Sequence, residues 1–120
     1  DIDGTTERGS DDHIVDTVVG IAEDEQPAFL IAQLGRVDDV FHQFGPSSSE
    51  VVPMLRETDA RLASLTARLK PLGYGVIILA DHGQHDIVDD GGGNRDSTTP
   101  LKGGHGSDSD QDCQVPCTWL

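Results

Sequence analysis

The chain has 120 residues, of which 35% are hydrophobic and 25% charged, a composition typical of one globular domain or of a piece of one. Its 22 acidic residues outnumber its 8 lysines and arginines and give a formal net charge of -14, which argues against a nucleic-acid-binding surface. No apolar run reaches the length of a membrane span, and no segment resembles a signal peptide.

The first expected elements are a helix and a strand. Ser10 is a suitable N-cap for a helix that runs to about Ala22. The apolar run PAFLIAQL, residues 27–34, predicts a short strand that is buried on both faces. The polar junction GRVDDVFHQFGP, residues 35–46, follows this strand.

A long helix is expected next. Ser47 and Glu50 form a capping box that would begin it, and Gly73 is a suitable residue to end the unit. The apolar residues of its expected buried stripe are Val51, Leu55, Leu62, Leu65 and Leu69.

The remaining third of the chain predicts two more strands separated by a loop. The expected segments are a buried strand YGVIILA over 74–80, a loop rich in Gly, Asp and Ser over 83–112, and a third strand VPCTWL over 115–120. Apolar strands that alternate with helices predict an α/β fold. We therefore expect a three-layer sandwich with a mostly parallel sheet, as part of a larger domain.

The two cysteines predict free thiols. Cys113 and Cys117 are four residues apart, so an extended chain would separate their Cα atoms by roughly 13 Å. A disulfide tolerates no more than about 7 Å. Free thiols favour an intracellular, cytoplasmic location.

Two explanations of the acidic excess stay open. Many aspartates and few lysines resemble the composition of proteins from salt-loving microbes, in which salt screens the repulsion between carboxylates. Alternatively, many of the carboxylates are metal ligands or decorate surface loops.

Side chains that can bind metal lie beside each predicted strand. Asp38 and His42 follow the first strand, Asp81 and His82 follow the second, and His105 precedes the third. In open α/β sheets, ligands bind at the carboxyl ends of the strands. These five residues are therefore candidates for one site.

Local geometry supports this grouping. Asp38 and His42 are four residues apart and would share a face of a helical turn. Asp81 and His82 are neighbours, and they can converge only if the chain turns at Gly83. Carboxylates and imidazoles without thiolates suit zinc or manganese in a hydrolytic site.

Three segments resemble a known family: VDDVFHQFGP, ILADHGQHD and GGHGSDSDQDCQVP. They are similar, in the same order, to the C-terminal metal-binding segments of the alkaline phosphatase superfamily. The most similar branch is the type I phosphodiesterase/nucleotide pyrophosphatase group. This resemblance covers about residues 10–120.

The resemblance implies two divalent metal ions, zinc or manganese, and a small-molecule phosphate ester as substrate. It implies that Asp38, His42 and His105 hold one ion and that Asp81 and His82 hold the other. In this family a Thr or Ser attacks phosphorus, and water then hydrolyses the covalent phosphoenzyme with the help of the two ions.

The chain also departs from the family pattern. The family nucleophile and a further aspartate lie far upstream of the Asp-x-x-x-His motif, whereas only 37 residues precede Asp38. We therefore expect residues 1–120 to be the C-terminal portion of a metal-dependent hydrolase domain, inactive on its own. His85 has no ligand role in this scheme and either supports the site from outside the ligand set or is an exposed loop histidine.

Two alternatives to this hydrolase are considered. The chain could be a non-catalytic metal-binding or structural domain that kept the ligands without a nucleophile. The segment DIDGTT at residues 1–6 also resembles the first motif of haloacid-dehalogenase-like phosphatases, with Asp1 as nucleophile and Asp3 as acid/base. That motif must follow a buried strand, and no such strand precedes Asp1 in this sequence.

Overall fold

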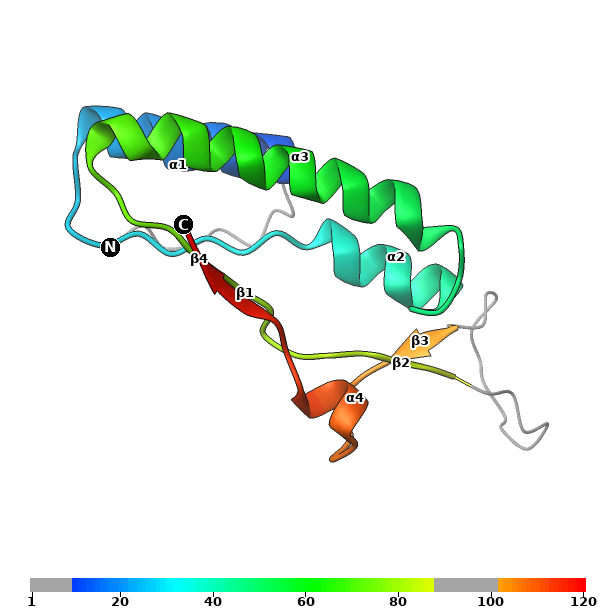
Figure 1. The fold of residues 1–120 in the computed structure, drawn as a ribbon. Coiled ribbons are helices and arrows are strands. Elements are labelled where there is room, and N and C mark those ends of the chain that lie inside the picture. The colour runs from blue at the N-terminus through cyan, green and yellow to red at the C-terminus, as the bar shows by residue number, and fades with distance from the viewer. Residues whose placement is uncertain (1–9, 88–101) are drawn as a thin grey trace.

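Three helices lie along one side of the molecule, and short strands together with a fourth, four-residue helix lie along the other, in the computed structural model, which describes residues 10–87 and 102–120 (Figure 1). The described helices are α1 (Asp11–Asp24), α2 (Arg36–Phe44), α3 (Val51–Leu69) with the 3-10 turn η1 (Lys70–Leu72), and the short α4 (Asp110–Cys113). The described strands are β1 (Ile77–Leu79), β2 (His85–Asp86), β3 (Gly103–Gly104) and β4 (Cys117–Trp119). The molecule is elongated, with extents of 53 × 27 × 26 Å.

The first helix is confirmed, whereas the predicted start of the long helix is wrong. The Ser10 side chain caps α1 by accepting a hydrogen bond of 3.3 Å from the backbone N–H of His13. Helix α3 begins at Val51 without a side-chain cap, so the predicted capping box of Ser47 and Glu50 does not form. The backbone N–H of Ser47 instead donates to the carboxylate of Asp86, which holds Ser47 outside the helix.

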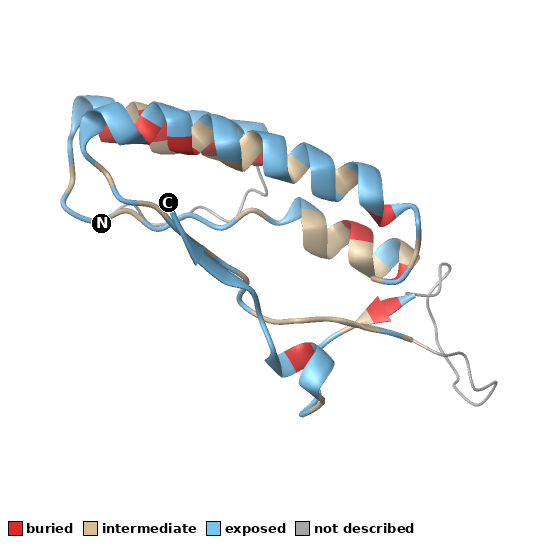
Figure 2. Ribbon diagram, viewed as in Figure 1, coloured by how far each residue is buried: buried red, intermediate tan, exposed pale blue. Residues whose placement is uncertain are grey.

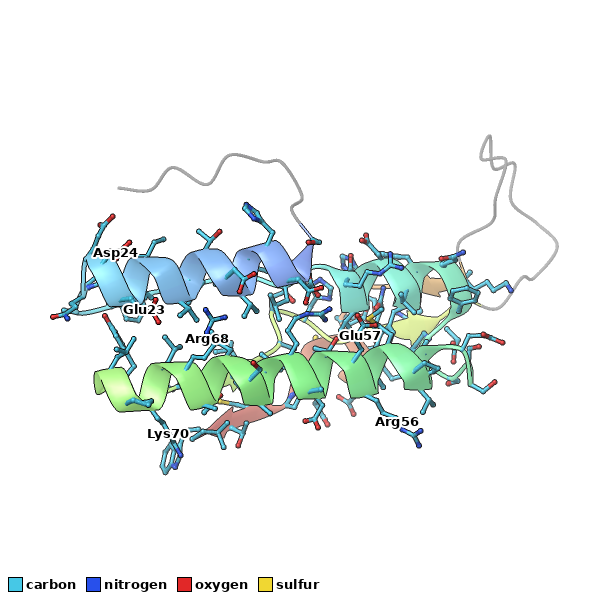
Figure 3. All side chains as sticks on the ribbon, turned by 90° about the horizontal axis from the view of Figure 1, so that it is seen from above. Glu23, Asp24, Arg56, Glu57, Arg68 and Lys70 are labelled. Atoms are coloured by element: carbon cyan, nitrogen blue, oxygen red, sulfur yellow. The ribbon has the colours of Figure 1, made fainter. Side chains whose placement is uncertain are left out.

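Helix α3 packs against both α1 and α2 (Figure 3), and most of the buried residues lie on these three helices (Figure 2). The core cluster consists of Val19, Ala22 and Leu69, with Val18, Leu30, Leu65, Tyr74 and Val76 packed around it. Val51 and Leu69 are buried, as predicted for the apolar stripe of α3, but Leu55 is 42% exposed. The core is therefore small and lies between helices.

The predicted three-layer α/β sandwich with a mostly parallel sheet is wrong. Strand β1 pairs antiparallel with β4, β2 pairs antiparallel with β3, and each pair forms a two-stranded sheet in the described ranges. Parallel neighbours need a long crossover, usually a helix. In the described parts of the connection from β1 to β4, the only helix is the four-residue α4, and the chain returns along β1 in the opposite direction.

The predicted buried strand over residues 27–34 is also wrong. The segment runs extended below the helices (Figure 1) but pairs with no strand among the described residues. Leu30 packs against the helical core, while Phe29 and Ile31 are 78% and 86% exposed. A strand buried on both faces needs cover on both, and the helices cover only one.

The segment over 83–112 is not a loop throughout. Its described parts contain β2, β3 and α4, and β2 and β3 pair with each other at His85↔Gly104 and Asp86↔Gly103. Both cysteines are exposed free thiols, as predicted. None of the helices in the described ranges is both long and apolar enough to cross a membrane.

Candidate metal centre

Helix α2 presents Asp38 and His42 on one face, as their spacing predicts. The Nδ1 atom of His42 lies 2.8 Å from the carbonyl oxygen of Gly103 and donates its hydrogen to that acceptor. The other ring nitrogen, Nε2, then carries a free lone pair and lies 3.4 Å from Oδ1 of Asp38. A backbone carbonyl that orients the imidazole in this way is typical of metal-binding histidines.

Strand β3 brings His105 to the same place by packing against the end of α2. The backbone N–H of Lys102 donates to the carbonyl oxygen of His42 over 2.8 Å. A Cβ atom at Gly103 would overlap the carbonyl oxygen of Phe41, so only glycine allows this approach. His105, two residues further on, is thereby placed beside α2.

Asp38, His42 and His105 form a cluster of suitable size for one cation. One ligand atom from each lies within 4.8 Å of the other two, and Oδ1 of Asp38 is 3.7 Å from Nε2 of His105. Two ligands bound to one zinc ion at about 2.0 Å in tetrahedral geometry are separated by about 3.3 Å. The distances from Oδ1 of Asp38 to Nε2 of His42 and of His105, 3.4 and 3.7 Å, are close to this value, and the imidazole and carboxylate donors fit zinc or manganese.

Asp81 and His82 lie next to this cluster. The ring of His82 stacks on that of His105, with centroids 3.8 Å apart and an angle of 21° between the planes. Nδ1 of His82 donates to the carbonyl oxygen of Gly83 over 2.9 Å, and its Nε2 lies 3.8 Å from Oδ2 of Asp81. The structure therefore brings all five predicted residues to one region, with three of them in a single cluster.

Two glutamines that the sequence reasoning did not single out fix the carboxylates of this region. Gln33 donates from Nε2 to Oδ2 of Asp81 over 2.8 Å, and Gln84 donates to Oδ1 of Asp38 over 3.4 Å. Gln84 lies two residues after His82, so its hydrogen bond to Asp38 links the second predicted ligand pair to the first. In the sequence, the only indication of this role is that each glutamine lies beside a predicted ligand segment.

His85 lies in a separate hydrogen-bonded group. Its Nδ1 atom is 2.8 Å from Oδ1 of Asp112, a buried carboxylate that also accepts hydrogen bonds from the hydroxyl and the backbone N–H of Ser107. The contacts with Ser107, followed by that with His85, lower the pKa of Asp112 to about 2. The sequence reasoning did not identify Asp112.

This lowered pKa predicts a pH dependence of stability. The ionised Asp112 carboxylate stabilises the fold above pH 4, where it is also ionised in the unfolded chain, and this contribution is lost as the pH falls towards 2. Urea unfolding of wild type and Asp112→Asn should therefore show a difference in unfolding free energy at pH 5 that shrinks by pH 2. A difference that stays constant over this range would contradict the assignment.

Comparison with known proteins identifies similar sequences. The family described as type I phosphodiesterase / nucleotide pyrophosphatase matches residues 4–114. Ectonucleotide pyrophosphatase/phosphodiesterase family member 1 of Homo sapiens is 34% identical over 67 residues, which is 52% of this chain and 7% of that protein. An uncharacterized pyrophosphatase/phosphodiesterase of Schizosaccharomyces pombe is 32% identical over 89 residues, 71% of this chain and 18% of that protein.

A venom phosphodiesterase of Macrovipera lebetinus is 34% identical over 67 residues, 52% of this chain and 8% of that protein. The chain thus spans less than a fifth of the length of each of these relatives. No solved structure gives a significant match.

Proposed function

Because the chain belongs to the type I phosphodiesterase/nucleotide pyrophosphatase family, we propose that it supplies metal-binding residues to a phosphoester hydrolase. The observation that carries this proposal is the convergence of Asp38, His42 and His105, with ligand atoms within 4.8 Å of one another. The orientation of His42 by Gly103, which leaves Nε2 free, supports the same role. The substrate class is a small-molecule phosphate ester.

Each residue has a separate part in this proposal. Asp38, His42 and His105 hold one zinc or manganese ion, and Asp81 with His82 contributes to a second site beside it. Bound there, the ions would polarise phosphoryl oxygens and lower the pKa of water. Gln33 and Gln84 hold the Asp81 and Asp38 carboxylates through hydrogen bonds.

We further propose that residues 1–120 are the C-terminal portion of a larger hydrolase domain. The similarity to much longer proteins, of which the matched segments make up less than a fifth, supports this. The exposed apolar side chains on the strand side also support it, because such residues are rarely left uncovered together. These side chains are Phe29, Ile31, Ile77, Leu79 and Trp119.

A non-catalytic metal-binding domain is the second candidate. It is favoured by one observation: among the described residues, no hydrogen bond joins a Ser or Thr hydroxyl to any of the five candidate ligands. The haloacid-dehalogenase-like alternative depends on Asp1 and Asp3, which lie outside the described residues.

Metal titration tests the proposed centre. In calorimetry with zinc and manganese, His105→Ala should weaken metal binding at the site of Asp38, His42 and His105, which we expect to be the tighter one because it has three ligands rather than two. The loss should be about 100-fold, because loss of one of three ligands removes on the order of 3 kcal/mol. Asp81→Asn should change the metal affinity of the same site by less than about tenfold, since Asp81 belongs to the other ligand pair.

The matched control is His13→Ala, which removes an exposed imidazole on α1 and should leave both affinities unchanged. Equal affinities of wild type and His105→Ala would rule out the assignment of this site.

A further inference from the structure

Asp112 is a buried acid whose two carboxylate oxygens are both occupied. Its side chain is 2% exposed. Oδ1 accepts a hydrogen bond of 2.8 Å from Nδ1 of His85, while Oδ2 accepts bonds of 2.8 Å from the N–H of Ser107 and 2.6 Å from its hydroxyl. One carboxylate thus joins two segments that are 22 positions apart in the chain, at His85 and Ser107.

The backbone of Asp112 contacts a third position in the chain. The carbonyl oxygen of Asp112 accepts a hydrogen bond of 2.7 Å from the N–H of Gly83. Helix α4 lies so close to Gly83 that a Cβ atom there would overlap the carbonyl oxygen of Gln111. Gly83 directly follows His82, so α4 fixes the chain beside a candidate ligand.

These contacts involve the two segments that carry the stacked imidazoles of His82 and His105. Asp112 binds Gly83 and His85, which lie one and three residues after His82. It also binds Ser107, two residues after His105. The two rings are 3.8 Å apart, and such a stack requires that both segments keep a fixed relative position.

We propose that Asp112 is a positioning residue for the candidate metal centre, which sets the segment carrying His82 against the segment carrying His105 through its bonds to His85 and Ser107. This inference rests on the proposed metal-binding function. It gives His85 a role: the imidazole connects the second predicted ligand pair to the buried carboxylate. Groups hydrogen-bonded directly to metal ligands commonly change metal affinity by about 10- to 100-fold, and because Asp112 acts through neighbouring residues we expect the lower end of this range.

The test compares Asp112→Ala with Asp110→Ala, which removes an exposed acid from the same short helix. In the metal-free chain, NMR should show upfield ring-proton shifts for His82 and His105, because stacked rings shield each other. Asp112→Ala should abolish these shifts and weaken zinc binding about tenfold. Asp110→Ala should change neither.

Asp112→Asn should give an intermediate loss, since the amide keeps one acceptor and His85 can change tautomer to match it. Should Asp112→Ala fail to fold, His85→Gln tests the same contact, because the His85 side chain is 31% exposed and its replacement is tolerated more easily. We expect several-fold weaker zinc binding by that variant.

Ring shifts or a zinc affinity that match wild type in both Asp112→Ala and His85→Gln would overturn the positioning role alone. Absence of zinc binding in wild type would instead overturn the proposed function, and the inference with it. The metal-free shifts and the wild-type titration therefore distinguish the two failures.

Discussion

Replacing Arg61 with methionine should lower the free energy of unfolding by about 3 kcal/mol, because it leaves a buried carboxylate without its cation. The Arg61 side chain is 10% exposed and that of Asp11 is 5% exposed, with Nη1 and Oδ2 3.9 Å apart. Arg61 also donates to Asp12 over 2.6 Å and to Glu57 over 2.8 Å. One guanidinium on α3 thus balances acids from α1 and from its own helix.

Methionine keeps the apolar length of the arginine stem, so the variant isolates the loss of charge and hydrogen bonds. Arg68→Met is the matched control. Arg68 points from α3 towards α1 (Figure 3) and donates to Asp16 over 2.9 Å, but the two side chains are 43% and 71% exposed. Its replacement should cost less than about 1 kcal/mol.

Urea unfolding followed by far-UV circular dichroism measures both effects. The net charge of the chain is -14, so removal of either arginine adds the same overall repulsion. The difference between the two variants therefore reports the contacts of the buried Arg61 guanidinium, above all the one with the buried Asp11 carboxylate. Equal losses in Arg61→Met and Arg68→Met would contradict a special role for Arg61.

The elements predicted correctly from the sequence are those that depend on local interactions. A side-chain cap and an apolar stripe are contained within one helix, and together they correctly predict α1 with Ser10 as its N-cap. The Asp38 and His42 pair is also local, because four residues make about one helical turn. The structure places this pair on α2, as the spacing predicts.

The strands could not be predicted because their pairing depends on distant parts of the chain. An apolar run such as 27–34 indicates that its side chains avoid water, but it does not indicate which strand pairs with it. In the described residues the helices cover only one face of this run, and β1 pairs with β4 because the chain returns without a crossover helix. A continuous apolar run therefore does not specify a parallel sheet.

The sequence indicates the candidate ligands but not the residues that hold them in place. Asp and His beside predicted strands attract attention because they can bind metal, whereas Asp112 stands among other acids in DSDQDC and resembles them in sequence. Its three hydrogen-bond donors belong to Ser107 and His85, and the latter is 27 residues away. Only the folded chain distinguishes it from Asp110.

The 120-residue chain should show no significant hydrolysis of a p-nitrophenyl phosphate monoester or diester, even with zinc or manganese added. Positioning and electrostatic stabilisation supply most of the rate enhancement in phosphoryl transfer. His42, His82 and His105 are 25%, 32% and 34% exposed, so water is not excluded from the region. No Ser or Thr hydroxyl among the described residues makes a hydrogen bond to the candidate ligands.

The longer protein proposed above should hydrolyse at least one of these esters, and His82→Ala in that protein should abolish the activity. His13→Ala is again the control, because its imidazole lies on α1 and is exposed. Turnover by the purified 120-residue chain that disappears in Thr5→Ala or Thr6→Ala would contradict the prediction. It would assign the nucleophile to Thr5 or Thr6, the two hydroxyl residues of DIDGTT, a segment outside the described residues, because the activity would then depend on that hydroxyl.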